Sequence, residues 1–284
     1  MTIERLELGA CAKLNLFLHV TGRRKDGYHL LQTVFQLVDL CDTVVLERAP
    51  AGEIAFRPGS DAPGGGDDLT LRAARRLAEA TGVRAGVRIG LSKRIPAGGG
   101  LGGGSSDAAT VLRGLDRLWG LGLGVDGLAK LGAGLGADVP VFVRGRTAWG
   151  EGVGERLTPV STAVRHYVVC DPCVAVETGR IFADPELTRD TPVQRISAFF
   201  DGGGHNDCTP VVRRLYPGID AALCWLSRFG DARLTGTGGC IFLPCANASE
   251  AMRVVRNCPA PWRAWAVRAL DASPTQVALE GAPR

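Results

Sequence analysis

The chain has 284 residues, of which 45% are hydrophobic and 22% charged, and its formal net charge is +4 at pH 7. These values are typical of a folded globular protein and exclude disordered, coiled-coil and collagen-like chains. The sequence has no apolar run long enough for a membrane span and no apolar signal-peptide core at its start. We therefore expect a cytoplasmic protein with no membrane partner.

The first predicted element is a strand at residues 6–20, where every even position from 8 to 20 is apolar. A period of two places alternate side chains on opposite faces of a sheet. Lys13 and Asn15 therefore share a face. Because Lys13 lies among apolar residues, its ammonium group needs a carboxylate or a phosphate as partner; a surface lysine is the alternative.

The next elements follow from hydrophobic periodicity and from the positions of glycine and proline. In chain order they are a turn at 22–27, strands at 30–40 and 43–46, a loop at 58–68, a helix at 69–80 and a strand at 86–91.

A glycine-rich loop at 96–106 then leads directly into a predicted helix that runs to Trp119, with Ser105, Ser106 and Asp107 as residues suited to its N-terminus. Backbone N–H groups at such a junction bind anions, so the loop indicates a phosphate site. It is not a Walker A loop, because no lysine follows Gly104, and no strand ending in an acidic residue follows at the distance that a dinucleotide fold requires.

The remaining segments predict a helix at 128–135, a strand entered through residues 137–143 with Asp138 at its mouth, and then alternating strand and helix patterns. The strands are expected at 167–170 and 240–243, and the helices at 221–229 and 249–255. Residues 273–284 show no pattern. This order indicates an α+β protein of two domains, 1–154 and 155–284, divided at the glycine-rich stretch 150–154.

Several residues could carry chemistry. Asp138 is either a cap on local backbone or a general base, and its sequence context leaves both open. The glycine turn at 234–240 either lines the same site or merely turns the chain. A phosphate loop, a carboxylate and a lysine together are what phosphoryl transfer to an alcohol requires. The nine cysteines are expected to be reduced thiols, and no metal ligand set is predicted.

The loop at 96–106 resembles the nucleotide loop of the GHMP kinases, whose core reads Pro-x-x-x-Gly-Leu-Gly-Ser-Ser. Further blocks in the same chain order narrow the resemblance to members with a nucleobase-bearing acceptor. They lie at 12–16, 22–29, 31–36, 136–142, 181–187, 206–208 and 234–238.

This resemblance implies an N-terminal domain like ribosomal protein S5 domain 2 and a ferredoxin-like C-terminal domain. It implies ATP and Mg²⁺ as cofactors and transfer of the γ-phosphate to a hydroxyl of a small cytidyl-bearing alcohol, an isoprenoid precursor. It also implies a monomer or weak homodimer with no nucleic-acid partner.

Site roles follow from the same resemblance. Asp138 would be the base and Lys13 its charged neighbour, while Asn15, Tyr28, His29 and Phe182 would bind the acceptor. The ATP phosphates would be bound by Pro96, Ala97, Gly98, Gly99, Gly100, Leu101, Gly102, Gly103, Gly104, Ser105 and Ser106. Asp107 stands where the family pattern has Asn, and it would either cap the helix or meet a magnesium ion.

Two alternatives remain. The first is a GHMP kinase of the homoserine or mevalonate type, against which the Tyr28-His29 pair argues, because only a nucleobase-bearing acceptor needs such a pocket. The second is a nucleic-acid-binding module, suggested by the excess of arginine. It is disfavoured because the arginines alternate with acidic residues and form no dense basic run.

Overall fold

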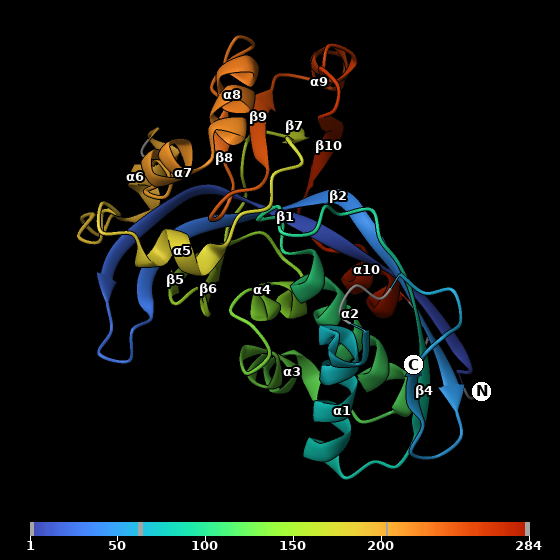
Figure 1. Cartoon of the computed structure of the whole chain (residues 1–284). Helices are drawn as coiled ribbons and strands as arrows, with labels where there is room; N and C mark the ends of the chain where they lie inside the picture. The colour runs from blue at the N-terminus through green and yellow to red at the C-terminus, as the bar shows by residue number, and fades with distance from the viewer. Residues whose placement is uncertain (1–2, 62–64, 203, 282–284) are drawn as a thin grey trace.

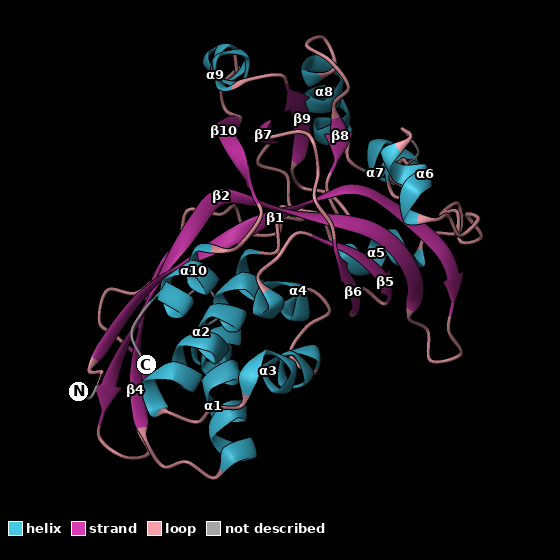
Figure 2. Ribbon diagram, turned by 180° about the vertical axis from the view of Figure 1, so that it is seen from behind, coloured by secondary structure: helices cyan, strands magenta, loops and turns pink. Residues whose placement is uncertain are grey.

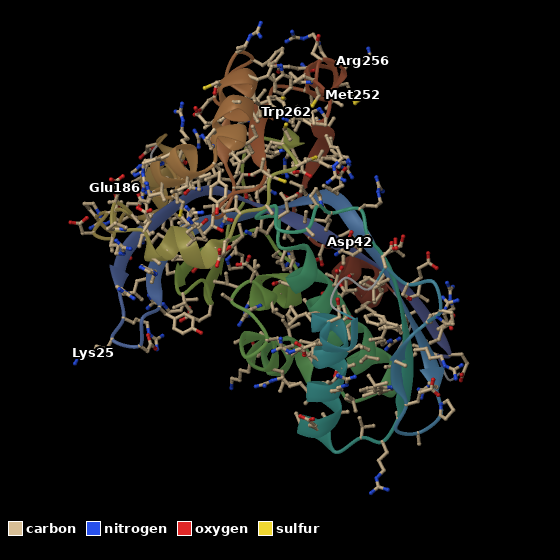
Figure 3. The ribbon with its side chains drawn as sticks, in the orientation of Figure 1. Lys25, Asp42, Glu186, Met252, Arg256 and Trp262 are labelled. Carbon is tan, nitrogen blue, oxygen red and sulfur yellow. The ribbon has the colours of Figure 1, made fainter. Side chains whose placement is uncertain are left out.

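A computed structural model describes residues 3–61, 65–202 and 204–281 of the chain. Two long antiparallel strands, β1 (Arg5–Arg23) and β2 (His29–Ala49), arch across the whole molecule (Figure 1). The two strand runs predicted at 30–40 and 43–46 are therefore parts of one strand. Lys25 lies in the turn between β1 and β2 and is exposed at its tip (Figure 3).

The N-terminal part of the chain completes one sheet and covers it with helices. Its further elements are β3 (Ile54–Phe56), η1 (Gly65–Asp67), α1 (Leu69–Thr81), β4 (Gly86–Ser92), α2 (Gly103–Trp119), α3 (Gly124–Ala133), α4 (Val139–Arg144), β5 (Ala148–Gly152) and β6 (Arg156–Pro159). The helices α1 to α4 gather on one side of the β1–β2–β4 sheet, as Figure 2 shows.

The C-terminal part builds a second group of strands with its own helices. Its elements are β7 (His166–Asp171), α5 (Thr178–Ala183), α6 (Ile196–Phe200), α7 (Thr209–Leu215), α8 (Pro217–Leu226), β8 (Arg233–Leu234), β9 (Ile241–Cys245), α9 (Ala248–Arg256), β10 (Arg263–Leu270) and α10 (Pro274–Gly281). The strands run in the order β10-β7-β9-β8, and β10 also pairs with β2, so the two parts share a continuous sheet.

Strand β1 contributes to three hydrophobic cores in succession. Ala10 packs with the helices α1 to α4, Leu14 packs in the core where the two parts meet, and Val20 packs among the C-terminal elements. Both faces of the strand are therefore buried over most of its length, which fixes its register. A polar side chain on this strand is held in place by packing on both sides.

The structure corrects the prediction of a strand entered through residues 137–143, because Val139–Arg144 form helix α4. The alternating valines at 139, 141 and 143 indicate a strand, but Pro140 is well suited to the first turn of a helix. Residues 139–143 are all apolar and buried, and α4 packs against α2 and α3, so these residues show no helical periodicity. Residues 274–281, which show no pattern, form α10, which packs on β1 and α2.

Strand β5 covers most of the glycine-rich stretch 150–154 and pairs with β2, and β6 pairs with β5. The division of the chain at residue 154 stays a prediction. The nine cysteines are all free thiols. Within the described part of the chain, no helix is both long and apolar enough to cross a membrane.

Candidate active site

The glycine loop ends at the N-terminus of α2, whose N-cap is Gly102 in the left-handed conformation with no side-chain cap. Ser105, Ser106 and Asp107, which the sequence placed at the helix N-terminus, lie within its first turns, because the helix begins at Gly103. Glycine permits the positive φ of 74° at residue 102. Without a capping side chain, the first N–H groups of α2 remain available to an anion.

A glycine turn of the C-terminal part packs directly on this loop. The Cys240 amide donates to the Gly99 carbonyl at 2.9 Å. A Cβ at residue 100 would lie 2.4 Å from the Thr235 carbonyl oxygen, so only glycine allows this approach. Gly236 and Thr237 of the same turn line the cavity beside the loop. The turn therefore contributes to the site and does more than reverse the chain.

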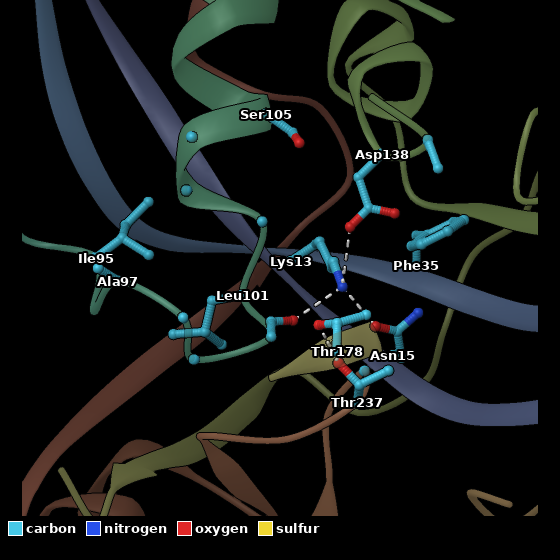
Figure 4. A pocket seen from close by; sticks show the side chains of 18 of the residues that line it. Lys13, Asn15, Phe35, Ile95, Ala97, Leu101, Ser105, Asp138, Thr178 and Thr237 are labelled. Carbon is cyan, nitrogen blue, oxygen red and sulfur yellow. Dashed lines mark hydrogen bonds and ion pairs between the residues drawn. The ribbon is translucent and has the colours of Figure 1, made fainter. Parts of the chain in front are cut away.

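Lys13 lies at the centre of the cavity, and its ammonium group has three partners (Figure 4). Nζ lies 2.5 Å from Asn15 Oδ1, 2.8 Å from the Gly100 carbonyl oxygen and 3.3 Å from Asp138 Oδ2. Its side chain is almost fully buried, as the apolar sequence around it indicates. The prediction that Lys13 and Asn15 share a face is confirmed, and the alternative of a surface lysine is wrong.

Asp138 precedes α4 but makes no capping hydrogen bond with its side chain. The carboxylate is 32% exposed and points toward Lys13 and the cavity (Figure 4). The sequence left two roles open for Asp138, a local cap and a general base, and the structure excludes the local cap. The group is partnered yet accessible, as a proton acceptor in a cavity must be.

Asp107 has a partner that the sequence did not suggest. Lys93 Nζ lies 2.5 Å from Asp107 Oδ2 and also contacts Asp42 Oδ2. Asp42, labelled in Figure 3, is fully buried. Its carboxylate accepts hydrogen bonds from the Arg94 and Ile95 amides. Burial, opposed by Lys93, raises the pKa of the Asp107 carboxyl to about 7. The group thus neither caps α2 nor stands free beside the phosphates.

Three of the four predicted acceptor residues, Tyr28, His29 and Phe182, line a second cavity. His29 and Phe182 stack with ring centroids 4.9 Å apart, and Tyr28 beside them is 64% exposed. Arg189 donates from Nε to His29 Nε2 at 3.2 Å. Burial and the positive charges of Arg189 and Arg23 lower the pKa of His29. These aromatic side chains line a cavity of about 550 Å³.

This aromatic cavity adjoins a cavity of about 590 Å³ between the glycine loop and Asp138. The two cavities share a set of lining residues, namely Leu31, Ala137, Val153, Thr178 and Phe182. Apart from Ser106, which is buried, the predicted nucleotide and acceptor residues thus line two adjoining cavities, and Lys13 and Asp138 line the one beside the glycine loop. Asn15 is nearly fully buried, and its side chain is bonded to Lys13 and to Thr33.

Sequence reasoning missed three polar groups of the site. Lys93 and Asp42 are distant in sequence and meet only through the pairing of β2 with β4. Thr178 lies in a segment with no periodicity. Only Lys93 carried a usable signal, as a lysine directly before a glycine loop.

Comparison with known proteins agrees with this geometry. Residues 68–146 match the GHMP kinases N terminal domain, and residues 193–264 match the GHMP kinases C terminal domain. A homoserine kinase structure from Cytophaga hutchinsonii has the same fold, with a TM-score of 0.70 at 15% identity over 97% of both chains. The fold and the glycine loop at the helix N-terminus are those of a GHMP kinase, and the α+β prediction is confirmed.

Relatives with higher sequence identity show which family within the GHMP kinases the chain belongs to. The 4-diphosphocytidyl-2-C-methyl-D-erythritol kinase of Alkalilimnicola ehrlichii is 52% identical over 272 residues, covering 96% of this chain and 94% of its own. That of Chromohalobacter salexigens is 50% identical and covers 98% and 95%. A crystal structure of 4-(cytidine 5'-diphospho)-2C-methyl-D-erythritol kinase has a TM-score of 0.80 at 37% identity, covering 93% and 99%. The chain belongs to the 4-diphosphocytidyl-2-C-methyl-D-erythritol kinase family and is an ATP-using kinase.

Proposed function

We propose that this kinase transfers the γ-phosphate of ATP to the 2-hydroxyl of 4-diphosphocytidyl-2-C-methyl-D-erythritol. The observation that carries the proposal is the pair of adjoining cavities, one beside the glycine loop and the Lys13–Asp138 pair and the other lined by aromatic side chains. A nucleotide-bearing acceptor would span this space with its cytosine beside Tyr28, His29 and Phe182.

Asp138 is proposed as the general base. Its carboxylate would accept the proton of the acceptor hydroxyl as that oxygen forms a bond to the γ-phosphorus. The bond from the γ-phosphorus to the bridging oxygen then breaks, and ADP leaves. The accessibility of the carboxylate and the absence of a cap bond support this role.

Lys13 is proposed to neutralise charge at the transferring phosphoryl group. Its contacts with Asn15 and the Gly100 carbonyl hold the ammonium group between the loop and Asp138. A charge held in this way needs no reorganisation during the reaction, and this is the main source of electrostatic stabilisation in enzymes. Asn15 would position the lysine and face the acceptor.

The glycine loop, residues 96–106, is proposed to bind the ATP phosphates through backbone N–H groups. Mg²⁺ would arrive with the nucleotide and supply charge neutralisation when bound. The described residues include no cluster of three or more His, Cys, Asp or Glu side chains suited to a metal ion. Such a site fits a metal held mainly by phosphate oxygens, water and a loop serine hydroxyl.

The proposal is tested by measuring ADP release from ATP and Mg²⁺ with four additions: 4-diphosphocytidyl-2-C-methyl-D-erythritol, homoserine, mevalonate and no acceptor. We expect turnover only with the cytidyl compound. Turnover with homoserine or mevalonate would support a kinase activity but would contradict the assignment of the aromatic pocket as the acceptor site. Phosphorus NMR of the product then identifies the hydroxyl that has been phosphorylated.

A further inference from the structure

A third cavity lies apart from the two cavities of the proposed active site. It has a volume of about 220 Å³ and is lined by residues of the loop before β7, of helix α6 and of strand β9. Within the described part of the chain, none of its lining residues lines either of the other two cavities. A ligand bound there would occupy neither the proposed ATP site nor the proposed acceptor site.

The walls of this third cavity are mainly apolar and partly aromatic. Phe199 and Phe200 of α6 meet edge to face with ring centroids 5.2 Å apart, and Phe242 of β9 meets Tyr167 in the same way at 6.0 Å. Phe200 is 48% exposed, although its side chain is large and apolar. A bound aromatic ring would add further edge-to-face contacts and would cover this exposed surface.

Tyr167 brings an unpartnered hydroxyl group to these walls. The residue is 1% exposed, and its Oη has no hydrogen-bond partner in the described part of the chain. The Thr162 hydroxyl lies nearby without the geometry of a hydrogen bond, and it donates to Gln36 Oε1 at 2.5 Å. Burial raises the pKa of Tyr167 to about 12, so the hydroxyl keeps its hydrogen. A buried donor is stable only when it is paired, so the cavity needs an acceptor here.

Arg233 of β8 is the one charged residue among the described residues that line this cavity. Its Nε and Nη2 donate to Asp231, which is 67% exposed and lies outside the cavity lining, and its Nη1 donates to the Leu16 carbonyl at 3.2 Å. A guanidinium group has five N–H donors, so two of them remain. The positive charge of Arg233 also opposes the effect of burial on the pKa of Tyr167. The charge and the hydroxyl therefore act at the same part of the cavity.

We propose that this cavity binds a small aromatic carboxylate, with its ring against Phe199 and Phe200 and its carboxylate at Tyr167 Oη and Arg233. An ionised carboxylate has only acceptors, which suits the spare donors, and its single negative charge matches one guanidinium group. The planar donor fork of arginine also fits a carboxylate. The volume is below the roughly 300–1,000 Å³ of pockets for drug-sized ligands, so it suits a ligand with one ring.

Fluorine NMR with 4-fluorophenylacetate tests the proposal on the intact chain. Two probes with the same ring separate the features of the ligand, because 4-fluorobenzyl alcohol has no charge and 4-fluorobenzyl phosphate has a different anion. We expect the Kd of the carboxylate to be about tenfold lower than that of either probe, the gain typical of a hydrogen bond to a charged group. Binding of the alcohol or the phosphate that is as tight or tighter would overturn the carboxylate assignment.

Tyr167→Phe removes only the hydroxyl oxygen. Because this oxygen has no partner, the variant is expected to fold with a melting temperature no lower than that of the wild type. We expect its Kd for 4-fluorophenylacetate to rise about tenfold and its Kd for the alcohol to rise less than threefold. Tyr216→Phe is the matched control, because the Tyr216 hydroxyl bonds to the Glu177 amide and lies outside the cavity lining. Wild-type affinity in Tyr167→Phe would show that the proposal is wrong.

Two further measurements locate the probe. Ala163 is exposed and lines the cavity, so Ala163→Trp should fill the space without disturbing the fold and should abolish binding of 4-fluorophenylacetate. Unchanged binding in a folded Ala163→Trp variant would place the probe elsewhere and overturn the proposal. ATP and CDP should not displace the probe from the wild-type protein. Displacement by either nucleotide would place the probe in the active site, which would also overturn the proposal.

Discussion

The two ends of the cavity are built in different ways. The loop end comes mainly from one contiguous stretch, residues 95–105, on which the glycine turn between β8 and β9 packs. The aromatic end is assembled from the β1–β2 turn, the β5–β6 turn and α5, which are distant in the sequence. A contiguous site can be identified from a motif, whereas an assembled site needs the fold. Variants at each end should therefore affect one ligand, and variants between them should affect the reaction.

The largest effect is expected between the two ends, at Asp138. Asp138→Asn keeps the size of the side chain but cannot accept the proton, so turnover should fall by roughly 10²–10⁴-fold. Calorimetry should show unchanged ATP binding. Asp126→Asn is a matched control, because Asp126 is 82% exposed and lies at the surface. Turnover within tenfold of the wild type would contradict the role of Asp138 as base.

The next largest effect concerns stability at the loop end. Lys93→Met would leave the Asp42 and Asp107 carboxylates buried without a cation, and removing one partner of a buried ion pair costs about 3–5 kcal/mol. Urea unfolding at pH 8 measures this loss. The double variant Lys93→Met/Asp107→Asn removes one of the stranded charges and should recover part of it. A double variant no more stable than the single one would show that Asp107 does not depend on Lys93.

A smaller and more selective effect is expected at the aromatic end. His29→Ala removes the ring that stacks on Phe182, and we expect the KM of the cytidyl acceptor to rise about tenfold. The KM of ATP should stay within twofold, because His29 lines only the aromatic cavity. Steady-state kinetics with each substrate varied in turn provides the measurement. Equal losses for both substrates would show that the two ends are not independent.

The smallest effect is a pH dependence. Burial, Arg189 and Arg23 lower the pKa of His29 below its ordinary value of 6.5, so the ring is neutral from pH 8 down to that value. The KM of the acceptor should be flat over this range and rise only at lower pH, where a protonated ring would repel Arg189. Arg189→Gln removes a positive charge, which raises the pKa of His29 and moves the rise in KM to higher pH. A rise that moves to lower pH would contradict this account.

Sequence analysis predicted the contiguous features of the site better than the features that only the fold assembles. The period of two in residues 6–20 predicted that Lys13 and Asn15 share a face, and their side chains are in contact. The role of Asp138 stays a prediction. The strand predicted after it was wrong, because the alternating valines at 139, 141 and 143 belong to helix α4. The sequence left the role of Asp107 open, because its partner, Lys93, follows β4 and comes close to it only in the folded chain.

The sequence by itself determined the α+β class, the glycine loop before a helix, and the lysine and amide that share one face of a strand. These are local properties, set by side-chain periodicity and by the conformational freedom of glycine. Only the tertiary structure decided that Asp138 faces Lys13, that Lys93 lies between Asp42 and Asp107, and that Thr178 meets Thr237. Each of these contacts joins segments whose separation along the chain carries no signal, because strand pairing and core packing bring them together.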